Sequence, residues 1–475
     1  MQTYWNDELY AQIEEKVKVN MPKFKDRDYV ITDKKYNDLI RRVTEKYYTA
    51  PAGIDINDKK CSTPLIENSQ LVDDYSKVFE AAINECSENG GGRVIVPAGV
   101  YYTGAIRLRS NVNLHIEKDG IIKFIRNKTN EFYPLVNTWW EGAECYNFSP
   151  FIYAYEENNI AITGEGTIDG QADYFNWMPW KYGRFGQESQ KKVRSMLFKW
   201  VEENIPVENR VLDDSISTLR PSFVGPTKCK NILIEGIRVI NSPMWEIHPV
   251  LSENILVRAL HIQTHYNNND GIDPEFCKDV IIEDCIIDTG DDCIAIKSGR
   301  NNDGRRIGRP SENIIIRNNI FKDGHGGLTL GSEISGSVKN VFAENNLFDS
   351  PNLDYPFRIK TNSVRGGVIE NVYLRNCTVN KARLAVVHAT MNYEEGDSGN
   401  FTPVIRNIFI AGFRTSDENN IEARYGFFFD AYERAPIQNV YLKDCEFNGV
   451  QEPVIMKNVH NIKFKNVRIN DKIIK

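Results

Sequence analysis

Short apolar segments recur along most of this chain, each in the same local pattern. Each copy starts at an Asn or Asp and continues with a branched apolar residue, any residue and a second apolar residue. The nine copies from Asn231 onward are spaced 22 to 36 residues apart, which is the range of solenoid repeats. The copies start at Asn111, Asn159, Asn231, Asn254, Asp279, Asn313, Asn340, Asn371, Asn407, Asn439 and Asn461.

A second polar position follows five residues after the start of each of these nine copies. Eight of the nine residues are Gly, Asn or Asp, which tolerate a left-handed turn, and the ninth is Ala259. The eight are Gly236, Asp284, Asn318, Asn345, Asn376, Gly412, Asp444 and Asn466. The next position is mostly apolar and predicts an inward stack of Ile237, Leu260, Cys285, Cys377, Phe413, Cys445 and Val467. Strand, left-handed corner and strand, repeated without helices, predict an all-β parallel β-helix, whereas a sandwich would need hairpin signals that are rare here.

Two regions depart from the repeat. Residues 1–70 are charged and weakly periodic, and we expect an irregular N-terminal segment that packs on the main body. The β-helix domain is expected over residues 71–475, with a capping helix at Asp73–Asn89 near its start and an insertion at 171–219. The insertion is expected to contain a helix from about Glu188 to Glu203.

Composition narrows the classes of partner. The formal charge of −7 argues against nucleic acid as the main partner. The sequence has no run of about 18 apolar residues, so no membrane span is predicted. Nine scattered cysteines predict mostly buried free thiols rather than a metal site. The first residues show neither a basic nor an apolar export region, so either the protein is exported with a signal peptide outside the given sequence or it is cytoplasmic.

The chemistry of the chain concentrates between Asn268 and Gly299. Four carboxylates fall within 23 positions there, at Asp270, Asp273, Asp291 and Asp292, each group beside a glycine. Crowded carboxylates repel, so at least one tends to keep its proton near neutral pH, as acid/base hydrolysis of a glycosidic bond requires. The alternative is a pair of Asx turns, because Asp and Asn next to Gly commonly form turns.

The following coils add further polar groups just past the same corner. His325 lies in a Gly-rich turn, and Arg358 and Lys360 lie on the coil after it. Successive coils of a solenoid are about 4.8 Å apart, so equal offsets within the repeat become neighbours on one face. We therefore expect the carboxylates, the histidine and the two cations to form one column.

Four segments of this column resemble a known family. Asn268-x-Asp270-Gly271-x-Asp273, Gly290-Asp291-Asp292, Gly324-His325-Gly326 and Arg358-Ile359-Lys360, in this order, are similar to the signature motifs of the polygalacturonase family of glycoside hydrolases. The resemblance covers roughly residues 90–470 and implies a right-handed parallel β-helix that hydrolyses α-linked galacturonic acid in pectin with inversion. Asn269 departs from the family pattern, where many members have Thr. The segment Gly327–Glu333 looks more like the bacterial exo-acting branch.

The resemblance also implies roles. Asp291 resembles the general acid, and Asp270 and Asp292 resemble the pair that holds the attacking water. His325 would tune this cluster or bind substrate, and Asn268 belongs to the substrate-binding positions. Arg358 and Lys360 would bind a uronate carboxylate. Lys297 and Arg300 are expected to extend this basic substrate site, with Arg305 and Arg306 in the loop that follows.

The insertion carries aromatic residues that would suit one end of a cleft. Trp177, Trp180, Tyr182 and Phe185, together with Trp139 and Trp140, would stack on sugar rings or form a satellite hydrophobic cluster. Closing one end of the cleft would favour exo action.

The leading hypothesis is therefore an exo-acting galacturonidase whose partner is a pectic poly- or oligosaccharide, without cofactor or metal. Three alternatives stay open: a hydrolase of the rhamnose-containing pectin backbone, a calcium-dependent β-helical pectate lyase, and a non-catalytic carbohydrate-binding β-helix.

Overall fold

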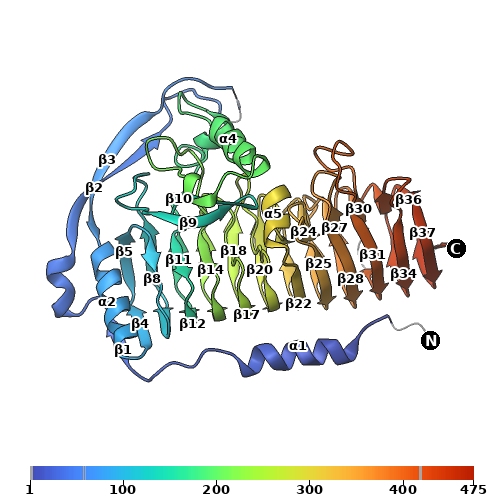
Figure 1. The fold of residues 1–475 in the computed structure, drawn as a ribbon, viewed down its shortest axis with the longest axis horizontal. Coiled ribbons are helices and arrows are strands. Elements are labelled where there is room, and N and C mark those ends of the chain that lie inside the picture. The colour runs from blue at the N-terminus through green and yellow to red at the C-terminus, as the bar shows by residue number, and fades with distance from the viewer. Residues whose placement is uncertain (1–3, 57, 59, 417–419, 475) are drawn as a thin grey trace. The chain divides into compact units, whose positions relative to one another are not determined.

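The structure is a computed structural model that describes residues 4–56, 58, 60–416 and 420–474, and the chain divides into two compact units. Unit 1 comprises residues 1–20, 253–259 and 270–475, and unit 2 comprises residues 21–252 and 260–269. In each unit, short strands pair in parallel from one coil to the next, with connections that turn corners between sheets (Figure 1). The predicted parallel β-helix is confirmed.

The described residues of unit 1 form three sheets and two helices. Sheet A consists of β17 (Glu253–Arg258), β19 (Lys278–Glu283), β22 (Ser311–Arg317), β25 (Val338–Glu344), β28 (Val368–Arg375), β31 (Val404–Ala411), β34 (Ile437–Lys443) and β37 (Val459–Lys465). Sheet B consists of β20 (Ile286–Thr289), β23 (Ile320–Phe321), β26 (Leu347–Asp349), β29 (Thr378–Lys381), β32 (Arg414–Thr415), β35 (Glu446–Phe447), β38 (Val467–Ile469) and the antiparallel β39 (Lys472–Ile474). Sheet C consists of β21 (Ile294–Ile296), β24 (Gly326–Leu330), β27 (Tyr355–Lys360), β30 (Ala385–Thr390), β33 (Tyr425–Asp430) and β36 (Glu452–Lys457). The helices are α1 (Asp7–Val19) and α5 (Asn301–Ile307).

Left-handed residues form the corners, as the repeat predicts. All nine residues at the second polar position have positive φ, including Ala259 at 54°. The Asn or Asp that starts each copy is left-handed too, and from Asp279 onward its side chain bonds its counterpart on the next coil. Asn340 Nδ2 donates to Asn313 Oδ1 at 3.0 Å, and Asn371 Nδ2 donates to Asn340 Oδ1 at 3.1 Å. The resulting asparagine ladder satisfies buried polar groups while it fixes the register of successive coils.

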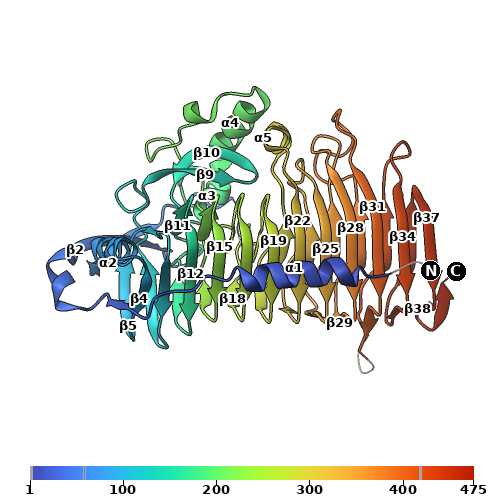
Figure 2. The ribbon, with the colours of Figure 1, turned by 60° about the horizontal axis from the view of Figure 1, so that its bottom comes forward.

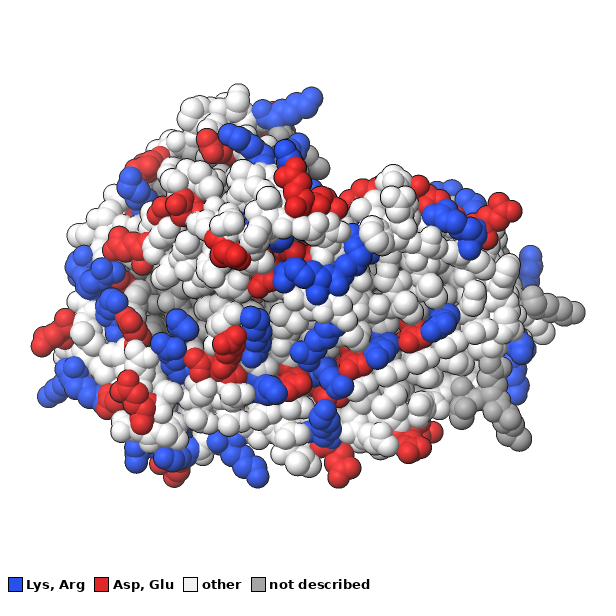
Figure 3. Space-filling view, viewed as in Figure 1, with Lys and Arg blue, Asp and Glu red and all other residues white. Residues whose placement is uncertain are grey.

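The outer face of sheet A is lined by charges of alternating sign. Opposed residues across neighbouring strands form the rows Arg258–Glu283–Arg317–Glu344–Arg375 and Lys278–Glu312–Lys339–Glu370–Arg406. Figure 3 shows blue and red side chains following one another in this manner. Opposite charges in direct register favour the pairing, whereas like charges would oppose it.

The helix α1 packs along this face of sheet A (Figure 2). It buries Tyr10, Ile13 and Val17. Its polar side chains reach strands of several coils: Lys16 pairs with Asp279 at 2.5 Å and Glu14 with Arg317 at 2.8 Å. The helix therefore spans successive coils rather than capping one of them.

Unit 2 begins with the same architecture. One sheet contains β1 (Asp28–Val30), β4 (Gly92–Val96), β7 (Val112–Ile116), β12 (Asn158–Gly164) and β15 (Lys230–Glu235). A second contains β2 (Arg41–Thr49), β3 (Ile66–Asp74), β5 (Gly99–Thr103), β8 (Gly120–Phe124), β13 (Thr167–Asp169), β16 (Arg238–Ile240) and β18 (His261–Thr264). A third contains β6 (Ile106–Arg107), β11 (Ile152–Tyr155) and β14 (Val224–Thr227). The unit also holds the hairpin β9 (Leu135–Trp140) and β10 (Ala143–Phe148), and the helices η1 (Lys34–Leu39), α2 (Ser76–Glu88), α3 (Pro179–Tyr182), α4 (Gln190–Glu202) and η2 (Val207–Asn209).

Some expectations about local structure were wrong. The segment expected to be irregular contains the helix α1 and the nine-residue antiparallel strands β2 and β3. The residues after Arg300, expected as a loop, form the short helix α5. The helix predicted at Asp73–Asn89 is observed as α2, which starts later because the Asp74 carboxylate accepts from Ser76 N at 2.8 Å in a turn. The domain boundary at residue 70 stays a prediction.

The predicted inner stack is buried, from Ile237 at 0% exposure to Val467 at 0%. All nine cysteines are free thiols and only Cys61 is not buried, as expected. In the part of the chain that the structure describes, no helix has the length and apolar character needed to cross a membrane.

Candidate active site

The predicted catalytic residues of unit 1 come together beside three neighbouring strands of sheet C. Asp291 and Asp292 precede β21, His325 precedes β24, and Arg358 and Lys360 belong to β27. The three strands are direct parallel neighbours. Asp270 joins them because the chain after it bridges to β21, where Gly271 N donates to Asp292 O at 3.0 Å.

Glycines permit this close approach. A Cβ on Gly326 would lie 2.7 Å from Asp292 Oδ1 and 2.0 Å from Thr329 Oγ1. A Cβ on Gly324, whose φ is 157°, would lie 2.7 Å from Asp291 O. A residue larger than glycine would clash at position 324 or 326. These two glycines therefore allow the turn to bring His325 against the carboxylates.

Three carboxylates share one small volume. Oxygen atoms of Asp270, Asp291 and Asp292 all lie within 4.8 Å of one another. Asp270 and Asp292 are buried, at 3% and 0% exposure, while the Asp291 side chain is 17% exposed. Oxygen donors at this spacing suit a hard cation such as calcium, but in this structure ammonium groups already pair with two of the three carboxylates.

Asp292 is the carboxylate most tightly bound by cations. Lys360 Nζ lies 2.5 Å from its Oδ2, and Arg358 Nη1 lies 3.7 Å from its Oδ1. Burial lowers the pKa of Lys360, but the charge of Asp292 outweighs it and raises that pKa above its ordinary value. Among the described residues, the buried Nε of Arg358 has no hydrogen-bond partner, and the rings of Tyr355 and Tyr393 lie 4.5 and 5.4 Å from its guanidinium carbon.

Asp291 and His325 form a pair that shares one proton. His325 Nδ1 lies 3.1 Å from Asp291 Oδ1. This hydrogen bond raises the pKa of His325 to about 9. Burial alone would raise the pKa of Asp291, but the hydrogen bond from His325 outweighs it and holds that pKa below its usual range. The shared proton therefore lies on the His325 side of the pair, whereas crowding alone would keep a proton on one of the carboxylates.

Asp270 is the member of the cluster with a raised pKa. Burial raises the pKa of Asp270 to about 7, opposed by Lys297 and reinforced by Asp291 and Asp292. Burial likewise raises the pKa of Asp273 well above its usual range. Both carboxylates face Lys297, whose Nζ lies 3.2 Å from Asp270 and 3.5 Å from Asp273.

Lys297 and Arg300, which were expected to extend the substrate site, are buried and paired with carboxylates. Lys297 is 2% exposed and also contacts Glu333 at 3.5 Å. Arg300 is 5% exposed and contacts Glu333 at 3.4 Å, Glu395 at 3.1 Å and Glu394 at 3.8 Å. Their charges are thus balanced by carboxylates that come from other coils.

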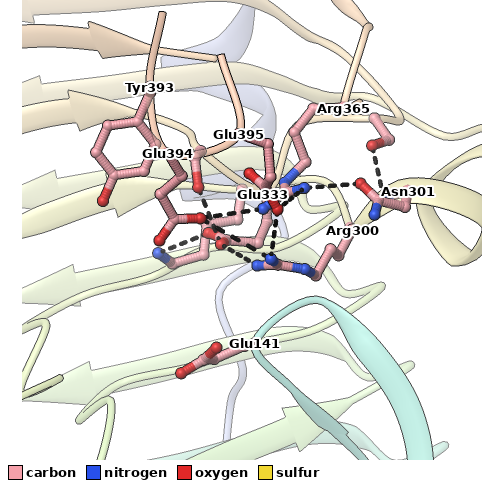
Figure 4. A network of polar contacts seen from close by, with 12 residues as sticks. Glu141, Arg300, Asn301, Glu333, Arg365, Tyr393, Glu394 and Glu395 are labelled. Atoms are coloured by element: carbon pink, nitrogen blue, oxygen red, sulfur yellow. Dashed lines mark hydrogen bonds and ion pairs between the residues drawn. The ribbon is translucent and has the colours of Figure 1, made fainter. Parts of the chain in front are cut away.

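These contacts belong to a larger network that sequence analysis missed (Figure 4). The fully buried Arg365 contacts Glu394 and Glu395 at 3.3 and 3.2 Å and donates to Asn301 Oδ1 at 2.9 Å. Near it, Tyr393 places its ring 5.1 Å from Lys360 Nζ. The network fixes the chain around residues 393–395 beside the predicted cations, and only the acidic pair in that loop could have signalled it.

Arg305 and Arg306, which were expected to extend the basic substrate site, make other contacts. Arg305 donates to the carbonyls of Val364 and Arg365 and lies 3.6 Å from the Phe401 ring centroid. Arg306 pairs with Asp303 on its own helix at 3.3 Å. Neither arrangement indicates a polyanion site.

Asn268, in unit 2, is held by cations rather than left open for substrate. Its Oδ1 accepts from Lys181 Nζ at 2.6 Å and from Arg220 Nη2 at 2.8 Å. Arg220 is fully buried and also binds Asn267 O at 2.9 Å and Gln190 Oε1 at 3.2 Å. The insertion, through Lys181 and Gln190, therefore fixes the chain segment that leads into Asp270.

The aromatic residues of unit 2 mostly form a satellite core. Trp140 packs with Leu197 and Val201 of α4 in one buried cluster, and Trp139, Trp177 and Phe185 are buried as well. Trp180 and Tyr182 keep partial exposure. Of the two expectations for these rings, the hydrophobic cluster describes the buried ones.

Comparison with known proteins adds independent information. The model of the family described as "Glycosyl hydrolases family 28" matches residues 86–468. The chain is 28% identical over 340 residues to a "Probable polygalacturonase" of Vitis vinifera, covering 69% of this chain and 62% of that protein. It is 26% identical to an "Exo-poly-alpha-D-galacturonosidase" of Dickeya chrysanthemi, covering 69% of this chain and 56% of that protein. The chain thus spans less than two thirds of these two relatives.

A solved structure matches the whole chain. The hyperthermoactive exopolygalacturonase from Thermotoga maritima superposes with a TM-score of 0.84 at 38% identity, covering 98% of this chain and 97% of that one. A polygalacturonase from Erwinia carotovora, 23% identical with a TM-score of 0.60, shares the fold.

Proposed function

The chain belongs to glycosyl hydrolases family 28, and from that premise we propose that it hydrolyses α-linked galacturonic acid in pectic polysaccharide, acting from chain ends. The observation that carries this proposal is the column of unit 1, in which three carboxylates lie within 4.8 Å of one another beside Arg358 and Lys360. The names of the exo-acting relatives from Dickeya and Thermotoga support the exo mode.

The reaction needs a proton donor for the leaving oxygen and a carboxylate that activates water. Asp291, the most exposed of the three carboxylates, would deliver the proton that it shares with His325. Because the pair holds this proton up to a pH of about 9, it is an acid throughout the neutral range. Asp270 and Asp292 would hold the water, and Asp270 would accept its proton once ionised.

Inversion of the anomeric configuration is part of the proposal. In many inverting enzymes the two carboxyl groups are roughly 6.5–9.5 Å apart to leave room for water. The present cluster is tighter. A water bound jointly by Asp270 and Asp292 does not have to fit between a single acid and a single base, so a compact triad is compatible with inversion. Proton NMR of the first-formed anomer tests this point.

Recognition of the uronate falls to Arg358 and Lys360. Arg358 has an unpartnered buried Nε, and a carboxylate bound there would satisfy it. Since Lys297 and Arg300 each contact three carboxylates, we assign them to positioning the catalytic column instead of binding substrate.

Product analysis tests the proposal most directly. On polygalacturonate we expect galacturonic acid monomer as the first product, with viscosity falling slowly. An early ladder of oligomers with rapid loss of viscosity would contradict exo action. Rhamnogalacturonan fragments, tested in parallel, would reveal the alternative substrate.

Chelation separates hydrolase from lyase. Activity should survive EDTA, and no product that absorbs ultraviolet light should form. Loss of activity in chelator with recovery in calcium would favour a lyase that uses the carboxylate cluster as its metal site. Pectic polymer lies outside the cell, so we also propose that the protein is exported, in line with the substrates named for its relatives.

A further inference from the structure

Unit 2 contains a hollow of about 720 Å³ that none of the predicted catalytic residues lines. Its walls come from β2, from the chain after β8, and from the insertion on both sides of α4. The side chains that matter here are Tyr48, Lys128, Trp180, Phe185 and Gln187. All of them belong to one compact unit.

The unusual group in this hollow is the Lys128 ammonium. Its Nζ lies 4.6 Å from the ring centroid of Trp180 and 5.6 Å from that of Trp177. Its one hydrogen bond is a long one, 3.5 Å to Gln187 Oε1, and among the described residues no carboxylate lies within ion-pair distance. Burial lowers the pKa of Lys128 to about 8. The charge of Asp173 opposes this shift, but Asp173 makes no direct ion pair with Lys128, so an anion bound directly to the ammonium would stabilise it.

The surroundings of Lys128 indicate what kind of anion fits. Aromatic rings of Tyr48 and Phe185 line the hollow, and its acidic lining residues Glu131, Glu188 and Asp214 are exposed. Two further cations line it, but each is paired: Lys46 with Glu67 at 2.9 Å and Arg126 with Glu45 at 2.9 Å. Aromatic walls beside a cation outside such a pair suit a ligand that has an apolar ring face and a carboxylate. A small inorganic anion would leave most of this volume unfilled.

We propose that this hollow is a second binding site for an acidic sugar, in which Lys128 Nζ binds the carboxylate and the aromatic side chains contact the sugar ring. Naming the sugar as galacturonate rests on the proposed function, whereas the carboxylate recognition does not. The site would hold either released monomer or the end of another pectic chain. Both sources offer the same carboxylate, so the ligands tested must separate them.

The first experiment is calorimetry on the full-length Asp291→Asn protein, which should bind trigalacturonate without consuming it. We expect two sites, of which one disappears in Asp291→Asn/Lys128→Met and persists in the charge-keeping Lys128→Arg variant. Lys118→Met, an exposed lysine in the turn before β8, is the matched control and should keep both sites. Galacturonic acid monomer at the second site would identify released product as the ligand, and selectivity for trigalacturonate would identify a chain end.

Two outcomes overturn the inference: unchanged stoichiometry in Lys128→Met, or equal binding of neutral galactose at that site. If one site is lost with Lys128 while pectic substrates are never cleaved by the wild-type protein, the second site stands and the proposed function fails. If pectic substrates are cleaved but only one site is ever found, the reverse holds.

A second measurement does not depend on whether Lys128→Met folds. Amine acetylation of the Asp291→Asn protein at pH 8, followed by mass spectrometry, should modify both Lys128 and Lys118. Trigalacturonate should protect Lys128 at least several-fold and leave Lys118 unchanged. Absence of protection at saturating ligand would overturn the proposal.

Discussion

Sheets A and C of unit 1 are stacked from the same coils but distribute charge in opposite ways. On sheet A, each charged residue of the two rows faces an opposite charge on the next strand, as Glu312 does between Lys278 and Lys339. Beside sheet C, Asp270, Asp291 and Asp292 bring like charges within 4.8 Å of one another. Paired exposed charges contribute little individually, whereas crowded buried ones require compensating cations and shift each other's pKa. The candidate catalytic residues therefore lie where charges of opposite sign no longer alternate.

The largest expected effect comes from the proton donor of the crowded site. Asp291→Asn should lower kcat by ~10²–10⁴-fold, the usual contribution of general acid catalysis, with an unchanged thermal unfolding temperature. Asp284→Asn is the matched control, because Asp284 occupies a left-handed corner that Asn tolerates equally well. An Asp291→Asn protein with most of its activity would remove this residue from the acid role.

Next in size is the loss of a compensating cation. Lys360→Ala leaves the Asp292 carboxylate without its 2.5 Å partner and should lower kcat/KM on galacturonate substrates about 10²-fold, chiefly through KM, as for buried ion pairs that lose one member. Lys339→Ala removes the partly exposed 3.0 Å ion pair with Glu312 on sheet A. It should leave kcat/KM unchanged and change the free energy of unfolding by no more than ~1 kcal/mol. Equal effects of the two substitutions would contradict the contrast between the sheets.

A smaller effect is expected in the pH profile. The activity kcat/KM should rise with pH through about 7, as Asp270 ionises, and fall through about 9, as the Asp291–His325 pair loses its proton. In His325→Gln the falling limb should move to lower pH, because Asp291 must then hold the proton alone, with a loss of roughly tenfold at pH 8 if the limb moves by about two units. An unmoved alkaline limb would show that the pair does not supply the acid.

The smallest effect on activity is expected at the ladder. Asn340→Ala forces Ala into a φ of 57° and removes two side-chain hydrogen bonds, so it should cost roughly 2–4 kcal/mol in urea unfolding while kcat/KM stays unchanged. Asn340→Gly keeps the backbone conformation and should cost less. A change in kcat/KM for either variant would show that the regular coils and the site are not separable.

Sequence predicted the repeat because its physical rule is local. A left-handed corner favours Gly, Asn or Asp, and that preference is visible one residue at a time. The same reasoning missed α1, since a single 13-residue amphipathic helix has no repeat to support it. It also could not show that Lys297 and Arg300 pair with Glu333 and Glu395, because these carboxylates come from other coils. Loop lengths decide such meetings, and no pattern within one coil encodes them.

The position of the proton in the catalytic cluster could not be predicted from the sequence either. The sequence indicates crowding, and crowding predicts that one carboxylic acid stays protonated. Which one depends on the burial of Asp270 and on the 3.1 Å contact between His325 and Asp291. Those are distances across coils, available only from the folded chain.

The helix α1 has a consequence for how unit 1 comes apart. In a solenoid each repeat couples only to its neighbours, so the array can fray from its ends. Here one helix binds Asp279, Arg317, Glu344 and Arg375, which lie on four successive strands. Fraying any one of these coils must also detach the helix from the others. Helix α1 thus couples coils that would otherwise unfold separately, and unit 1 should unfold cooperatively. Removing the contacts of α1 should allow partial, stepwise unfolding.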